Sequence, residues 1–536
     1  MHDLLIILPR VATLLFVLAF GACVGSLINV LVYRLPRGIG VVTPPSRCPA
    51  CHTRLRWKDN IPIIVWVLLR GRCRYCKAPI SPEYPLVELL CASLFGLFYV
   101  LWYLLPAASG PVEVLGIDLA SLAPDWAAVD RFSGVPTTSA PMLLVVLVLV
   151  GALLTMTLTD LKTTLIPLVL PWFATLAGVI VHTGYAAYLW AKGLEYPMPG
   201  AEATWRWAIP THGWSGLGLG LGGVAGIGVS LLLLRLGLIR QSFADAQDWE
   251  QAHREQLGLP PIAEQRLDAE HQPDPSQPGQ PAQTGQWRPR AGWWRPVVAV
   301  VLATAGCGLA GAWIAGLAGV VPAAGLGIGV VLGPIVAGVV LKLLAGGRSG
   351  PTDATHPEQA PDDADQPKRT PSDAEVWIHY PHARREMVKE MAFLAMPTVG
   401  AWVGMLLAGQ AQGLCPLWLD VLGGTLVGYL VGGGVVWMVR LLGSLGFGKE
   451  AMGLGDVHLM AAVGACLGWV DAVLAFFAAA FVGIVLTLYG VALSRGVGRA
   501  MPYGPALAIA TVLVLLFKPA IEAGLTRLTG QPINLP

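Results

Sequence analysis

Charged residues are what this chain lacks most: only 13% of its 536 residues are Asp, Glu, Lys or Arg, while 55% are hydrophobic. A typical soluble domain carries about 25% charged residues, so the composition excludes an ordinary soluble protein. Several apolar runs reach the roughly 20 residues that a helix needs to cross a bilayer. The short alternating segments of a membrane β-barrel are missing. We therefore predict an all-α, polytopic helical membrane protein with about twelve spans. The predicted spans are 4–32, 86–105, 142–159, 165–190, 214–238, 296–318, 321–345, 392–410, 417–440, 457–470, 472–493 and 504–518.

Acidic residues are nearly absent from the first loop. Residues 34–82 hold ten Lys and Arg but one acid, Asp59, whereas residues 107–141 hold four acids and one Arg. Because short loops rich in Lys and Arg stay in the cytoplasm, we expect residues 35–85 inside and 107–140 outside. The first apolar run lacks the basic start and short core of a signal peptide, and Phe20 fits poorly as a lipoprotein signal before Cys23. We expect an uncleaved first span with its N-terminus outside.

Two stretches between predicted spans contain little that a core could bury. Residues 240–295 are rich in Gln, Pro and charged residues, and residues 347–375 in Pro, Asp and Thr. Both are predicted to be disordered cytoplasmic loops. In residues 376–391, basic residues alternate with apolar ones, which fits a segment lying on the membrane face or a solvated linker. The glycine-rich spans 214–238 and 321–345 favour close helix packing.

Cysteine is also sparse, with nine in the whole chain, yet four of them form two Cys-x-x-Cys pairs in the basic loop. Two such pairs supply the tetrahedral cage of four thiolates typical of a structural zinc site. Two disulfides are the alternative, but a cytoplasmic loop is reducing. The predicted zinc ligands are Cys48, Cys51, Cys73 and Cys76. The others are expected to be small apolar packing residues: Cys23, Cys91, Cys307, Cys415 and Cys466.

Two lone aspartates adjoin apolar runs. Asp160 follows the run 142–158, and Asp456 lies in Gly453-Leu454-Gly455-Asp456-Val457. An acid at a membrane boundary is costly and by default marks a functional site, although Asp160 alone fits a solvated helix end equally well. Glycines let backbone approach the carboxylate and a substrate strand. Two adjacent carboxylates share a proton, so one can act as a general base on water and the other as a general acid. The pair therefore indicates aspartic proteolysis at a membrane surface.

In their order along the chain, these and further motifs resemble the bacterial type IV prepilin peptidases, which are bifunctional leader peptidases and N-methyltransferases. Besides the four cysteines, the resemblance is carried by Gly25-Ser26-Leu27-Ile28-Asn29-Val30, Arg34-Leu35-Pro36, Trp57, Asn60-Ile61-Pro62, Ile80-Ser81, Tyr84-Pro85, Glu88, Asp160, Ile166-Pro167, Gly448-Lys449-Glu450, Met452-Gly453, Gly455-Asp456, Gly464-Ala465 and Pro502-Tyr503-Gly504-Pro505.

The resemblance implies that Asp160 and Asp456 are the catalytic aspartates, supported by Gly453, Gly455 and His458. The implied substrate is a prepilin or pseudopilin, whose basic leader is cut after a glycine at the cytoplasmic face of the inner membrane. The new N-terminus is then methylated from S-adenosylmethionine. The implied partners are these substrates and membrane lipid, with no nucleic acid. Type IV pili, type II secretion and DNA uptake stay open as the pathway served.

No glycine-rich nucleotide fingerprint follows a predicted strand, so the S-adenosylmethionine site is not located. Gly71 and Glu88 are candidates for it on position only. Because aspartic proteolysis needs no metal, zinc is assigned to folding and substrate presentation.

The chain departs from the family pattern in three respects. His458 stands where the family usually has Lys, and Leu168 stands where it often has Asp. The family has about eight spans, so the surplus between the catalytic halves is interpreted as an insertion of an even number of spans, which keeps both aspartates on one side. The predicted organisation is a first span (1–34), a cytoplasmic four-cysteine zinc loop associated with methylation (35–85), the first half of the peptidase core (86–195), the insertion (196–410), the second half of the core (411–520) and a C-terminal tail (521–536).

Two other functions remain open. One is a peptidase without methyl transfer, which the cysteine loop disfavours because family members lacking that loop are peptidases alone. The other is a non-enzymatic membrane assembly factor or transporter on a decayed peptidase fold. Such a protein is expected to lose an aspartate or the Gly-x-Gly, and both are present.

Overall fold

The computed structural model describes residues 2–107, 113–114, 117–128, 130, 133–163, 165–193, 207–243, 246–256, 382–448, 450–493 and 503–531. In these residues, nine helices are long and apolar enough to cross a membrane. They are α1 (His2–Arg34), α3 (Glu83–Tyr99), α5 (Ala140–Thr163), α6 (Val169–Ala191), α7 (Gly213–Arg235), α12 (Ala383–Ala408), α13 (Leu417–Phe447), α15 (Trp469–Leu493) and α16 (Gly504–Thr529). The predicted polytopic helical fold is confirmed, and the chain is a multi-pass membrane protein.

The predicted number of about twelve spans is not confirmed. Nine predicted spans coincide with the long helices, and the predicted span 457–470 falls on α14 (Leu454–Leu467), which has 14 residues. A helix of that length extends about 21 Å, which is less than the roughly 30 Å hydrocarbon core of a bilayer. The predicted spans 296–318 and 321–345 lie outside the described residues.

Short helices, turns and one strand pair lie between the long helices in the described residues. They are α2 (Ile64–Leu68), α4 (Asp125–Ala128), α8 (Ala246–Gln256), the 3₁₀ segments η1 (Leu35–Arg37), η2 (Trp57–Asp59) and η4 (Leu119–Leu122), the π-helical turn η3 (Val100–Leu104), and a two-stranded antiparallel pair of β1 (Glu113–Val114) with β2 (Ile117–Asp118).

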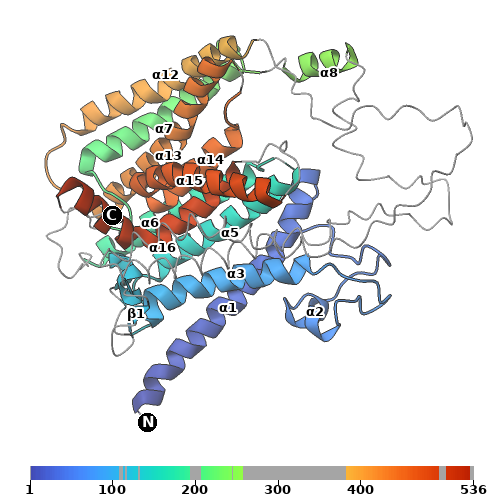
Figure 1. Cartoon of the computed structure of the whole chain (residues 1–536). Coiled ribbons are helices and arrows are strands. Elements are labelled where there is room, and N and C mark those ends of the chain that lie inside the picture. The colour runs from blue at the N-terminus through green and yellow to red at the C-terminus, as the bar shows by residue number, and fades with distance from the viewer. Residues whose placement is uncertain are drawn as a thin grey trace, which may run out of the picture.

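Two loop predictions are corrected. The helix α8 lies inside 240–295, so that stretch is not disordered throughout; Figure 1 draws α8 apart from the bundle. Residues 383–391 are not a solvated linker, because they form the first turns of α12 and bury Glu386, Met387 and Glu390. The rest of the predicted segment, 376–381, lies outside the described residues. Polar pattern alone does not reveal such burial, since the partners of these side chains lie elsewhere in the chain.

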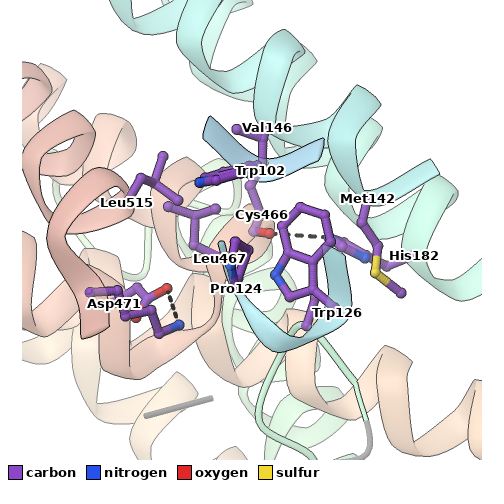
Figure 2. A pocket seen from close by; sticks show the side chains of 12 residues that line it. Trp102, Pro124, Trp126, Met142, Val146, His182, Cys466, Leu467, Asp471 and Leu515 are labelled. Carbon is purple, nitrogen blue, oxygen red and sulfur yellow. Dashed lines mark hydrogen bonds and ion pairs between the residues drawn. The ribbon is translucent and has the colours of Figure 1, made fainter. Parts of the chain in front are cut away.

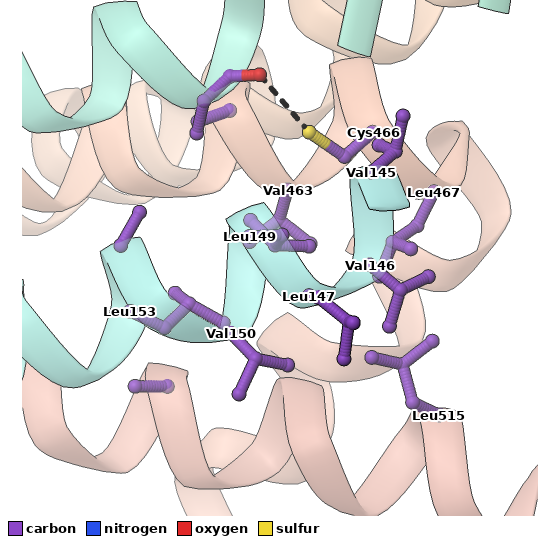
Figure 3. Packing of buried hydrophobic residues seen from close by; sticks show 14 of the residues in the cluster. Val145, Val146, Leu147, Leu149, Val150, Leu153, Val463, Cys466, Leu467 and Leu515 are labelled. Atoms are coloured by element: carbon purple, nitrogen blue, oxygen red, sulfur yellow. Dashed lines mark hydrogen bonds between the residues drawn. The ribbon is translucent and has the colours of Figure 1, made fainter. Parts of the chain in front are cut away.

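The centre of the bundle is the short helix α14, which contacts α13, α6, α15, α5 and α16. Nearly all its side chains are buried, as expected of a helix that is apolar on every side. Figure 3 shows Val463, Cys466 and Leu467 of this helix packed against the row of Val and Leu on α5, with Leu515 of α16 beside them. The thiol of Cys466 donates to the carbonyl of Ala174 at 3.3 Å. Asp456 lies in the first turn of α14, at one end of this core.

Glycines set the closest helix contacts. A Cβ on Gly464 of α14 would lie 1.9 Å from the carbonyl oxygen of Gly428 on α13. Likewise, a Cβ on Gly222 of α7 would lie 2.1 Å from the carbonyl oxygen of Gly400 on α12, and the two helices run side by side in Figure 1. Only glycine permits such backbone approach, so the close packing predicted for 214–238 is confirmed. The other glycine-rich span, 321–345, lies outside the described residues.

A pocket lies at the end of α14 opposite Asp456 (Figure 2). One wall holds an ion pair, Lys518 to Asp471 at 2.9 Å. Another holds His182, whose Nε2 donates to the carbonyl of Cys466 at 3.1 Å while Nδ1 accepts from Trp207 at 3.2 Å. That pattern fixes a neutral imidazole. Neither Asp160 nor Asp456 lines the pocket, so it is separate from the predicted dyad.

Candidate active site and cysteine cluster

The two predicted aspartates meet at one end of the bundle. Asp160 lies in the last turn of α5 and is 6% exposed, and Asp456 lies in the first turn of α14 and is 8% exposed. The charge of Asp160 acts on Asp456, so the two carboxylates are within range of mutual repulsion. The fold thus brings together two acids that lie in different halves of the chain.

Asp456 is held by the start of its own helix. Gly453 is the N-cap of α14, and its amide donates to the Asp456 carboxylate. This is the half of a capping box in which an acid three positions into the helix reaches back to the N-cap amide. The partial positive charge of a helix N-terminus also favours the carboxylate form there.

Asp160 is held by a different helix. The amide of Gly504, the first residue of α16, donates to the Asp160 carboxylate. A Cβ on Gly504 would lie 2.6 Å from Asp160 Oδ2, so only glycine lets the backbone come this close. The first amides of a helix lack intrahelical partners and are suited to bind an anion. The sequence analysis used Gly504 only as part of a motif; the available signal was its place at the start of a helix, directly before Pro505.

Ile166 joins the two halves of the site. A Cβ on Gly455 would lie 3.0 Å from Ile166 Cβ, and one on Gly504 would lie 3.4 Å from Ile166 Cδ1. Gly455 therefore permits the close approach of α14 to the segment that follows Asp160. Gly453 is less crowded, because the nearest atom to a Cβ built there is Asp456 Oδ2 at 3.7 Å. Gly453 contributes to the site through its amide, described above.

His458 lies on the same helix as Asp456 but two residues further along, which turns it by about 200°. Its ring faces Trp172 of α6 at 6.3 Å between centroids, and Trp172 in turn faces Tyr429 of α13 at 6.1 Å. The ring of His458 is thus part of a small aromatic cluster among α6, α13 and α14. Its proposed support of the dyad has to act through space.

The four predicted zinc ligands come together in the loop between α1 and α3. Their sulfur atoms all lie within 4.8 Å of one another, and Cys48 Sγ is 3.9 Å from Cys76 Sγ. Four thiolates around zinc at about 2.3 Å stand about 3.8 Å apart, so the donor set fits this metal. All four are free thiols, so the two-disulfide alternative is not what the structure contains.

Hydrogen bonds stabilise the cluster and its surroundings. The hydroxyl of Thr53 beside Cys51 lowers the pKa of that thiol to about 6, which favours the thiolate that a metal needs. Asp59 accepts from Arg74 Nε at 2.6 Å and from the hydroxyl of Tyr75 at 3.0 Å. Burial opposes ionisation of Asp59, but these donors keep its pKa below the ordinary value. Asp59, the only acid between α1 and α3, therefore links η2 to Arg74 and Tyr75 of the second cysteine pair.

The cysteine loop and the aspartates occupy the same end of the bundle. An ion pair joins Lys162, two residues after Asp160, to Glu83, the first residue of α3. The side-chain amide of Asn29 on α1 donates to the carbonyl of Tyr84 at 3.1 Å. The helices that frame the loop are thus fastened to the helix that carries Asp160.

The two positions considered for S-adenosylmethionine both have structural contacts. Gly71 has a φ of +67° and a built Cβ would lie 2.9 Å from the Trp66 ring, so it needs to be glycine for the turn itself. Glu88 is buried and accepts from the amide of Ile63 at 2.7 Å. These contacts hold the start of α2 against α3.

Comparisons with known proteins cover both ends of the chain. Residues 19–102, which include the four cysteines, match the family described as Bacterial Peptidase A24 N-terminal domain. Residues 395–488, which include Asp456, match the Type IV leader peptidase family. Asp160 lies outside both matched ranges, and the second range begins within α12. No solved structure matches the chain significantly.

Several curated relatives are named prepilin leader peptidase/N-methyltransferase. The one from Myxococcus xanthus is 53% identical over 87 residues, 16% of this chain and 25% of that relative. The one from Dickeya chrysanthemi is 38% identical over 140 residues (22% and 49%), and the one from Klebsiella pneumoniae 40% identical over 121 residues (22% and 51%). The chain thus spans at most about half the length of these relatives. Both family matches and all three relatives confirm the resemblance that the motifs indicate, which is to the type IV prepilin peptidases.

Proposed function

We propose that this protein is a membrane aspartic endopeptidase that removes the leader peptide of type IV prepilins or pseudopilins. The observation that carries the proposal is the buried pair Asp160 and Asp456, each bound by the N-terminus of a helix. A pair of interacting carboxylates titrates as a unit. One proton shared between them leaves one carboxylate as base and the other as acid at the same pH.

In the proposed reaction, the ionised carboxylate removes a proton from water as the water attacks the carbonyl carbon of the scissile bond. The protonated partner donates its proton to the leaving nitrogen when the carbon–nitrogen bond breaks. The amides of Gly453 and Gly504 hold the two carboxylates in place throughout. The pair again holds one proton at the end, because the base has taken one from water while the acid has given one to the leaving nitrogen, so the two carboxylates have exchanged roles.

The proposed site faces the cytoplasm at the inner membrane. The support is the charge of the cysteine loop, which holds ten Lys and Arg but one acid in residues 34–82 and is therefore expected to stay inside. A substrate whose basic leader also stays inside would present its cleavage site at that face.

The second proposed activity is methylation of the newly freed N-terminus from S-adenosylmethionine, associated with the cysteine loop. The names of the relatives support it, and so does the presence of the loop. Zinc held by Cys48, Cys51, Cys73 and Cys76 would fix the fold of the loop and take no part in proteolysis. Gly71 and Glu88 remain the candidate positions near the methyl donor, although their contacts give each a structural use.

The test is mass spectrometry of a pilin precursor co-expressed with this protein in membranes. We expect a product shortened by its leader and heavier by one methyl group than the bare N-terminus. A product that is cut without methylation would leave a peptidase alone, and an untouched precursor would favour a non-enzymatic assembly factor. Loss of the product with Asp160→Asn separates cleavage by this chain from cleavage by a host enzyme.

A further inference from the structure

The side chain of Arg440 is a buried cation close to the predicted dyad. It lies on α13, is 1% exposed, and does not touch either aspartate through any described contact. A buried charge is costly unless it is paired and hydrogen-bonded. Its partners therefore indicate what it is there to hold.

On one side Arg440 binds helix α12. Its Nε and Nη2 donate to the carboxylate of Glu390 on α12 at 3.1 and 2.9 Å. Glu390 is 3% exposed and also accepts from Trp437 Nε1 at 2.8 Å. The Phe243 ring, in the segment after α7, lies 5.6 Å from the guanidinium. The planar fork of Arg against a carboxylate fixes the orientation of the guanidinium.

On the other side Arg440 binds the segment that leads into α14. Its Nη1 donates to the carbonyl of Met452 and to the half-exposed carboxylate of Glu450. Met452 directly precedes Gly453, the N-cap whose amide holds Asp456. A bond to the Met452 carbonyl therefore fixes where α14 begins and where the carboxylate of Asp456 stands.

We propose that Glu390 is a positioning residue for Asp456: helix α12 supplies the carboxylate that orients Arg440, and Arg440 holds the segment before the dyad. This rests on the proposed peptidase function. Without Glu390, the guanidinium is free to turn toward Glu450 and water, and the Met452 carbonyl loses its fixed donor. A shift of about 1 Å at a reacting group can cost about 100-fold in rate.

The chain offers a matched control on the same helix. Glu386 lies one turn before Glu390 and is 2% exposed. It accepts from the amide of Phe243 at 2.8 Å and from Lys389 at 2.7 Å, and no described bond joins it to Arg440. Glu386→Gln therefore removes a buried charge from the start of α12 without removing a bond to Arg440. It separates a general loss of stability there from a loss of Arg440 orientation.

The first test measures kcat and KM for leader removal with Glu390→Gln, Arg440→Gln, the double variant and Glu386→Gln. Glutamine has nearly the size of glutamate, but it replaces one carboxylate oxygen with an NH₂ group. That group cannot accept a hydrogen bond from the donors around Glu390. We expect Glu390→Gln to lower kcat by about 10-fold to 100-fold, with KM little changed, and the double variant to be no slower than Arg440→Gln. Multiplying losses in the double variant, or an equal loss in Glu386→Gln, would overturn the proposal.

The second test does not depend on activity. Hydrogen–deuterium exchange of the amides at residues 450–456 should quicken in Glu390→Gln and stay as in the wild type in Glu386→Gln. Unchanged exchange in Glu390→Gln refutes the positioning role even if the wild type cleaves prepilins. Faster exchange in Glu390→Gln, together with a wild type that cleaves no prepilin, would support the contact and refute the proposed function instead.

Discussion

The cysteine cluster and the aspartate pair lie at the same end of the bundle but are built in opposite ways. The four cysteines come from one loop between two helices, and hydrogen bonds within that loop complete their surroundings. The two aspartates come from helices in different halves of the chain, and a third helix, α16, supplies an amide to one of them. One site depends on local spacing, and the other depends on helix packing.

The two sites should therefore fail differently. A change in the loop should remove the metal and disturb whatever the loop presents, while the bundle that carries the aspartates stays intact. A change in helix packing should move the carboxylates while the cysteines keep their metal. Each of the following variants is expected to affect one site more than the other.

The largest effect is expected from the aspartates themselves. Asp160→Asn and Asp456→Asn should each lower leader cleavage by about 10³-fold or more, because proton transfer by a positioned side chain contributes about 10²–10⁴-fold. Zinc content should be unchanged in both variants. Normal processing of a co-expressed precursor in membranes by either variant would contradict the dyad.

A smaller effect is expected when only the support of Asp160 changes. Gly504→Ala places a Cβ 2.6 Å from Asp160 Oδ2, so the carboxylate has to move, and cleavage should fall by about 10-fold to 100-fold. Gly524→Ala on the same helix is the control, because nothing lies within 4 Å of a Cβ built there. Equal cleavage rates for the two variants would show that the approach of Gly504 to Asp160 is not needed.

Loss of a cysteine should affect the loop more than proteolysis. We expect purified protein to carry about one zinc, and Cys73→Ser to lose most of it, since removing one thiolate opens the tetrahedral site. Methylation should then fall further than cleavage. Cys23→Ser, outside the cluster, should keep the metal. Wild-type protein without zinc by elemental analysis, or an unchanged content in Cys73→Ser, would refute the site.

The smallest effect is expected at His458. A free imidazole titrates near pH ~6.5 and a lysine near ~10.4, so positive charge near the dyad fades with rising pH in the wild type and persists in His458→Lys. Because a nearby cation favours the ionised form of both carboxylates, the pair should lose its shared proton at lower pH in His458→Lys, so cleavage should fall at a lower pH than in the wild type. Superimposed pH profiles would leave His458 as a packing partner of Trp172.

The sequence by itself determined the membrane class, the nine long helices among the described residues and the grouping of four cysteines, and it predicted the two aspartates as a dyad. These follow from short-range patterns: apolar run length, the spacing of Cys-x-x-Cys, and an isolated acid beside an apolar run. The glycine pattern at 214–238 likewise predicted the close packing of α7 on α12, because the absence of a side chain is visible in the sequence.

Only the tertiary structure decided what completes each site. The amide of Gly504 reaches Asp160, Glu390 reaches Arg440, and Glu88 is committed to the amide of Ile63. It also showed that Glu386 and Glu390, which the polar pattern of residues 376–391 placed at a surface, are buried. Polarity in a sequence records that a side chain needs a partner, but the partner is chosen by contacts between segments far apart in the chain.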